Sequence, residues 1–130
     1  MVSERRKKVL IVDDESGMVS ILQRIVLNAG YESYTASTGQ EALEKIQNEA
    51  PDLVLLDLVM PGLTGFETCR RIRENEATKN VPVFIVSALR SGADSDTAAD
   101  SGATEFINKP FDAPDLAKRI RMRLGSPFKL

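Results

Sequence analysis

Five side chains that could do chemistry stand where short apolar runs of the sequence end. They are the side chains of Asp13, Asp14, Asp57, Ser87 and Lys109. Each alone could cap a helix or shape a turn. Three carboxylates brought close together repel each other and raise each other's pKa unless positive charge neutralises them. A hard divalent cation such as Mg²⁺, which prefers oxygen ligands and retains waters, would supply that charge.

The same residue types are the electrostatic parts that phosphoryl transfer needs. A metal, an ammonium and a hydroxyl around one carboxylate can stabilise a transferring phosphoryl group. An ionised carboxylate such as Asp57 can attack phosphorus itself and form an acyl phosphate without a general base. Histidine is absent, which excludes His-based zinc sites, Ser-His and Cys-His nucleophile pairs, and a phosphohistidine within this chain.

The apolar runs that precede these residues are predicted to be strands. The runs at 9–12, 53–56 and 83–86 are too short for isolated helices and lie between turn signals, so they predict buried strands. The segments at 31–36 and 105–108 are less continuously apolar, which is typical of edge strands.

Helical patterns separate the predicted strands. One apolar face is expected for the first helix, formed by Met18, Ile21, Leu22, Ile25, Val26 and Ala29. Capping boxes at 38–41 and 64–67 predict the starts of two further helices, and Asp112 can cap the last one. In the helix after Thr64, Phe66 and Cys69 are expected inside and Arg73 outside.

Strands that alternate with helices predict an α/β fold. We expect a doubly wound (βα)5 three-layer sandwich with a parallel five-stranded sheet of order 2-1-3-4-5. In such a sheet, ligands bind beyond the carboxyl ends of the strands at the point where the strand order reverses. The five side chains are therefore expected to converge on one edge of the sheet.

Composition limits the domain organisation and the partners. A chain of 130 residues suits one domain, at 9–124, with a charged lead-in at 1–8 and a tail or linker start at 125–130. A net charge of −2 without a basic stripe argues against direct nucleic-acid binding. The sequence contains no run of 18 apolar residues, so no membrane span is predicted. A single cysteine and a charged N-terminus without a signal-peptide pattern favour the cytoplasm.

Four segments together resemble a known family. They are Val-Asp-Asp-Glu at 12–15, Leu-Asp-Leu-Val-Met-Pro-Gly at 56–62, Val-Ser-Ala at 86–88 and Phe-Ile-Asn-Lys-Pro-Phe at 106–111. In order and spacing, the chain from 9 to about 124 resembles the receiver domain of two-component response regulators, which has a flavodoxin-like fold. The resemblance implies that Asp57 accepts a phosphoryl group from a phosphohistidine on a separate histidine kinase or histidine phosphotransfer protein.

The resemblance also implies a set of metal ligands. Asp13 or Asp14, together with Asp57 and the backbone carbonyl of Val59, would hold Mg²⁺, with Asp14 the more direct ligand of the acidic pair. The apolar side chains of Val59 and Leu89 stand where family members often carry polar ones. Neither can orient an attacking water, so we expect slow loss of the phosphoryl group.

Other residues would respond to phosphorylation. By the resemblance, Ser87 and Lys109 would bind phosphoryl oxygens, Phe106 would be the aromatic switch residue, and the Lys109–Pro110 bond would be cis. Phosphorylation would then change the face formed by residues 92–111 and control an output domain or protein that the sequence does not identify.

The segment at 92–103 contains no large apolar residue, so it should be weakly anchored and is expected to move with the switch. Acidic residues on this segment and basic residues on the last helix are open to two interpretations. They form either two solvated faces or a homodimer interface through residues 93–124.

Two other functions remain open at this point. A Mg²⁺-dependent phosphohydrolase with an aspartyl nucleophile would need an acid or base near Asp57, where Val59 stands instead. A receiver-like scaffold that works without phosphorylation should have lost Asp14, Asp57 or Lys109, and all three are present. We therefore expect a signalling domain that catalyses only its own phosphorylation and dephosphorylation, and no enzyme acting on other substrates.

Overall fold

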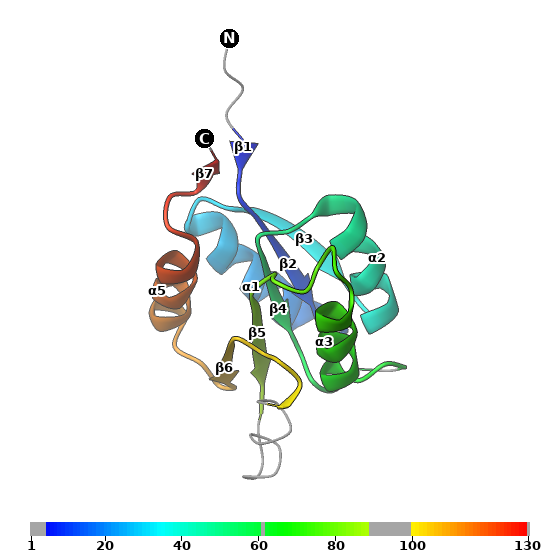
Figure 1. Ribbon diagram of the computed structural model, residues 1–130. Helices are drawn as coiled ribbons and strands as arrows, with labels where there is room; N and C mark the ends of the chain where they lie inside the picture. The colour runs from blue at the N-terminus through cyan, green and yellow to red at the C-terminus, as the bar shows by residue number, and fades with distance from the viewer. Residues whose placement is uncertain (1–4, 61, 89–99, 130) are drawn as a thin grey trace.

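The computed structural model describes residues 5–60, 62–88 and 100–129. Its centre is a parallel five-stranded sheet of order β3-β2-β4-β5-β6 (Figure 1). Counted along the chain within this sheet, that is the predicted order 2-1-3-4-5. The elements are β1 (Arg5–Arg6), β2 (Lys8–Val12), α1 (Ser16–Asn28), β3 (Glu32–Ala36), α2 (Gly39–Glu49), β4 (Leu53–Leu56), α3 (Gly65–Glu74), β5 (Val83–Ser87), β6 (Glu105–Asn108), α5 (Ala113–Leu124) and β7 (Phe128–Lys129).

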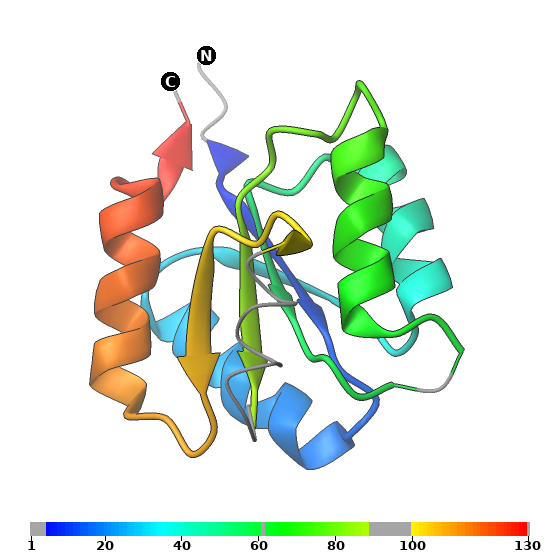
Figure 2. The same cartoon turned by 60° about the horizontal axis from the view of Figure 1, so that its bottom comes forward.

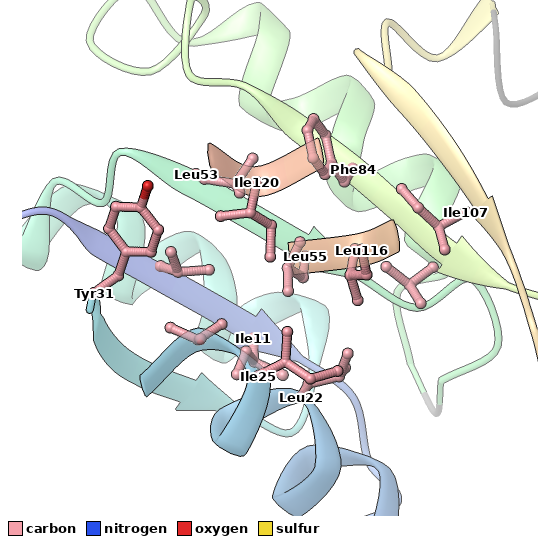
Figure 3. Close-up of a cluster of buried hydrophobic side chains, with 13 residues drawn as sticks. Ile11, Leu22, Ile25, Tyr31, Leu53, Leu55, Phe84, Ile107, Leu116 and Ile120 are labelled. Atoms are coloured by element: carbon pink, nitrogen blue, oxygen red, sulfur yellow. The ribbon is translucent and has the colours of Figure 1, made fainter. Parts of the chain in front are cut away.

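Alternate residues of the central strands build two cores, one on each face of the sheet. In β2, Val9 and Ile11 pack with α1 and α5, whereas Leu10 and Val12 pack with α2 and α3. Figure 3 shows the first of these cores, with side chains from both helices lying against the sheet. The predicted three-layer sandwich is therefore confirmed. A continuous apolar run suits a central strand because both of its faces are buried.

The described residues contain four of the expected five helices. Helices α2 and α3 begin as predicted, since Thr38 and Thr64 each accept a hydrogen bond from the backbone N–H three residues later. The predictions for the segment at 92–103, including its motion and its acidic surface, rest mainly on residues 89–99, which lie outside the described residues. They stay predictions.

Two local expectations were wrong. Ile21 was expected on the buried face of α1, but the residue is 50% exposed, because the helix buries a narrower stripe of Leu22, Ile25 and Val26. Asp112 stands at the N-cap position of α5, but its side chain makes no capping hydrogen bond there.

The two ends of the described chain pair with each other. Arg5 and Arg6 of the expected lead-in form an antiparallel ribbon with Lys129 and Phe128 of the expected tail. This β1–β7 ribbon lies next to the amino ends of the sheet strands (Figure 1). None of the helices within the described ranges is both long enough and apolar enough to cross a membrane.

Candidate functional site

The carboxyl ends of the central strands place two aspartates side by side. The backbone N–H of Asp13 donates to the carbonyl of Ala36 over 3.1 Å, and that of Asp57 donates to the carbonyl of Val12 over 2.9 Å. The hydrogen-bond ladder thus continues one residue beyond β2 and β4. In Figure 2 the strands of the central sheet point toward the same edge of the molecule. This edge lies at the switch point of the sheet, where a ligand site is expected.

Three carboxylates meet at this edge. Asp13 is 3% exposed and Asp57 is 8% exposed, while Asp14 is open to solvent. One oxygen from each carboxylate lies within 4.8 Å of the others. Two buried carboxylates and one accessible carboxylate form a donor set of hard oxygens, which fits a divalent cation that keeps some of its waters. The acidic residues present can therefore hold a metal ion.

The Lys109 side chain places a positive charge beside these carboxylates. Its Nζ lies 3.2 Å from Oδ2 of Asp13, to which it donates a hydrogen bond, and 3.6 Å from Oδ1 of Asp57. The backbone N–H of Lys109 donates to the carbonyl of Ser87 over 3.1 Å. The pairing of β5 with β6 therefore positions Lys109 at the carboxyl edge of the sheet. The peptide bond to Pro110 is cis, as expected.

The pKa of the Asp57 carboxyl is raised above its ordinary value. Burial is the largest cause, and the negative charge of Asp13 adds to it. The Lys109 ammonium, a hydrogen bond with the Ser87 side chain and the backbone N–H of Leu58 each lower the pKa, but together they do not cancel the effect of burial. Ionised Asp57 is therefore held at a cost in free energy, which additional positive charge at the site would relieve.

Two backbone donors, which sequence reasoning missed, orient the buried carboxylates. The N–H of Leu58 donates to Oδ1 of Asp57 over 2.9 Å, and the N–H of Glu15 donates to Oδ1 of Asp13 over 3.0 Å. The second contact has the two-residue spacing of an Asx turn, so an aspartate before a helix start is a signal for it. The contact at Leu58 has no such signal in the sequence.

The remaining site residues occupy different environments. Ser87 is buried beside Asp57. Phe106 is partly buried and belongs to the small apolar cluster of Leu58 and Ile85. Val59 is 73% exposed, and the role of its carbonyl as a metal ligand stays a prediction. Leu89 lies outside the described residues.

The fold agrees with comparisons to known proteins. The family model of the response regulator receiver domain matches residues 9–121. The chain is 42% identical over 118 residues to a probable transcriptional regulator ycf27 of Guillardia theta, covering 91% of this chain and 45% of that protein. It is 36% identical over 115 residues to the alkaline phosphatase synthesis transcriptional regulatory protein PhoP of Bacillus subtilis, covering 88% of this chain and 47% of PhoP.

A solved structure has the same fold. The crystal structure of a putative response regulator from Chloroflexus aurantiacus superposes with a TM-score of 0.88 at 30% identity, covering 94% of this chain and 100% of that one. The present chain spans less than half the length of the ycf27 and PhoP relatives. Over nearly all of its own length, it belongs to the response regulator receiver domain family, the phosphoacceptor module of two-component signalling.

Proposed function

We propose that Asp57 is the phosphoacceptor and that its donor is a phosphohistidine on a separate histidine kinase or histidine phosphotransfer protein. One observation carries the proposal: a buried carboxylate at the switch point lies beside two further carboxylates and the Lys109 ammonium. In the transfer, an oxygen of Asp57 forms a bond to phosphorus while the phosphorus–nitrogen bond to imidazole breaks. The departing imidazole nitrogen takes up a proton from water.

The chain's own groups have distinct parts in this step. Asp13, Asp14, Asp57 and the Val59 carbonyl would hold Mg²⁺, which, when bound, supplies positive charge for the phosphoryl oxygens. Lys109 pairs with Asp13 and Asp57, and we infer that its ammonium pairs with a phosphoryl oxygen instead once Asp57 carries the phosphoryl group. The buried Ser87 hydroxyl stands beside Asp57 and would donate a hydrogen bond to a second oxygen.

The consequence of phosphorylation would be a signal to a partner. Phe106 packs near Ile85, two residues before Ser87, so a movement of Ser87 toward a phosphoryl group would disturb the packing of this ring. We propose that this change alters the face at 92–111 and thereby controls an output domain or protein. Formation of a homodimer through residues 93–124 is one way in which phosphorylation would act on that output. The single cysteine suits the reducing conditions of the cytoplasm, where we place the domain.

The test is uptake of a phosphoryl group from acetyl phosphate with Mg²⁺, followed by intact mass spectrometry. The wild-type chain should gain one phosphoryl group, the Asp57→Ala variant none, and the control Asp115→Ala, which removes an exposed carboxylate on α5, should behave as wild type. An adduct that persists in Asp57→Ala would overturn the assignment of Asp57. A wild-type chain that takes up no phosphoryl group would favour the scaffold, and rapid turnover of an external phosphomonoester would favour the phosphohydrolase.

A further inference from the structure

The first residue of α3 packs directly on the backbone that carries Asp57. A methyl group on Cα of Gly65 would lie 2.3 Å from the carbonyl oxygen of Asp57 and 2.6 Å from Cα of Leu58. Both neighbours are backbone atoms, so no side-chain rotation could make room. The N–H of Gly65 also donates to the carbonyl of Leu58 over 3.0 Å. The helix start and the acceptor backbone are therefore in contact as closely as a glycine permits.

A second glycine makes a similar contact from the neighbouring helix. A methyl group on Gly39, the first residue of α2, would lie 2.2 Å from Oγ1 of Thr68 and 2.9 Å from Cβ of Leu63. Thr68 is buried, and its hydroxyl donates to the carbonyl of Thr64 over 2.8 Å. Gly65 of α3 thus lies against Asp57 and Leu58, and Gly39 of α2 lies against Leu63 and Thr68.

These two glycines are needed for space and not for backbone conformation. Neither Gly39 nor Gly65 has a positive φ, so alanine could adopt the same backbone angles at either position. Gly62 in the same loop is the opposite case, since its φ is 80° and nothing lies within 4 Å of its missing side chain. An effect of alanine at position 65 would therefore come from the collision with Asp57 and Leu58.

We propose that Gly65, assisted by Gly39, is a positioning residue of the acceptor site. The missing side chain lets α3 seat the Asp57–Leu58 backbone so that the Asp57 carboxylate meets Asp13 and Lys109. The Leu58 N–H donates to the Asp57 carboxylate. A side chain at position 65 would therefore displace this donor together with the Asp57–Leu58 backbone. Metal coordination and in-line transfer both depend on the placement of this carboxylate. The effect on phosphoryl transfer rests on the function proposed above, but the effect on cation binding does not.

The experiment compares two glycine-to-alanine changes in first helical turns. In Gly65→Ala the new methyl group meets backbone, while in the control Gly17→Ala of α1 the nearest atom is the Glu15 carboxylate oxygen at 4.0 Å. Calorimetry measures the Kd for Mg²⁺, and intact mass follows the rate of phosphorylation by acetyl phosphate. We expect Gly65→Ala to weaken Mg²⁺ binding roughly 10- to 100-fold and to slow phosphorylation. Gly17→Ala should leave both unchanged.

Amide spectra recorded without metal separate a failure of this proposal from a failure of the proposed function. The Leu58 amide resonance should move in Gly65→Ala and stay in place in Gly17→Ala, whether or not the wild-type chain accepts phosphate. If Gly65→Ala lowers only Tm, and keeps the wild-type Kd for Mg²⁺ and rate of phosphorylation, the residue is merely structural and the proposal is overturned.

A second pair of variants covers the case in which Gly65→Ala does not fold. In Gly39→Ala the closest obstacle is the side-chain hydroxyl of Thr68 and not backbone, so this side chain can partly give way and a smaller loss of Mg²⁺ affinity is expected. The same change made in a Thr68→Ala background should cost less, because that hydroxyl is gone. Unchanged Mg²⁺ affinity in Gly39→Ala would then contradict the proposal.

Discussion

Asp57 carries its charge at a buried position next to a second buried carboxylate, that of Asp13. Burial raises the pKa of Asp57, the Lys109 ammonium lowers it, and the pKa remains raised overall. The features that make this oxygen available as a nucleophile therefore also destabilise the folded chain. Lys109 offsets part of that cost within the chain, and a cation bound at the site would offset more of it.

Asp57→Asn should accordingly stabilise the fold at neutral pH in the absence of divalent cations. The pKa of Asp57 is higher in the folded chain than the unfolded value of about 3.9. Ionisation of Asp57 therefore lowers the free energy of unfolding as pH rises from the unfolded pKa through the folded pKa. Urea unfolding at pH 7 should show a gain on the order of 1 kcal/mol. The gain should shrink as pH falls toward the unfolded value. The exposed-site control Asp115→Asn should show no gain, and an Asp57→Asn variant less stable than wild type at pH 7 would contradict this account.

At the scale of the elements, α3 is tied to the strands beside it by one arginine. Arg73, which was expected to face water, donates to the carbonyls of Gly102 over 2.9 Å and Val81 over 2.5 Å. It also donates to the carbonyl of Lys79 over 3.1 Å and reaches Oγ1 of Thr104 at 3.4 Å. A planar guanidinium with five donors can join the segments that lead into β5 and β6 to the end of α3.

Arg73→Lys keeps the charge but cannot reproduce this set of contacts. Several backbone carbonyls would lose a donor, so the free energy of unfolding should fall by about 1–3 kcal/mol. Arg70→Lys, at an exposed position of the same helix, is the matched control and should change it little. Urea unfolding of both variants makes the comparison. Equal stabilities would show that the Arg73 contacts contribute nothing beyond charge.

At the scale of the whole molecule, the two ends of the described chain pair with each other at the side of the sheet that lies away from Asp57. Tyr31 is buried, and its hydroxyl donates to the carbonyl of Gly125 over 2.6 Å. The N–H of Lys7 donates to the carbonyl of Pro127 over 2.7 Å, and the Lys7 ammonium donates to the carbonyl of Leu124. The Arg6 guanidinium lies 5.1 Å from the centre of the Phe128 ring. These contacts hold the segment that follows α5 against β1 and the start of β3.

Tyr31→Phe should loosen this closure without affecting the acceptor site. Loss of the hydroxyl leaves the Gly125 carbonyl without that donor, which should cost about 0.5–1.5 kcal/mol. Hydrogen exchange at the Lys7 amide should quicken, while exchange at the Val54 amide in the central sheet and phosphorylation by acetyl phosphate should not change. Tyr34→Phe is the matched control, because the Tyr34 hydroxyl donates to the Glu32 carboxylate of the same strand over 3.3 Å. Equal exchange rates at Lys7 in the two variants would contradict the proposed closure.

Much of the fold and the site was predictable because the information is local. The runs at 9–12 and 53–56 are apolar throughout, which identifies strands buried on both faces and places them at the centre of the sheet. The residue that follows each run must then stand at the carboxyl edge, which is why Asp13 and Asp57 could be assigned to one site. Each step uses neighbours in sequence together with one general rule of parallel sheets.

Only the tertiary structure decided which segments far apart in the chain touch. The exposure of Ile21, the carbonyls that Arg73 meets and the ribbon between the two ends were not indicated by any local pattern. Gly65 is the sharpest case, because its sequence context is that of an ordinary helix start. Its lack of a side chain acquires meaning only when α3 packs against the Asp57 backbone, because a methyl group at position 65 would lie 2.3 Å from the Asp57 carbonyl oxygen. Local residue types determine which helix or strand a segment can form. The packing of distant segments against each other determines where a side chain has no room.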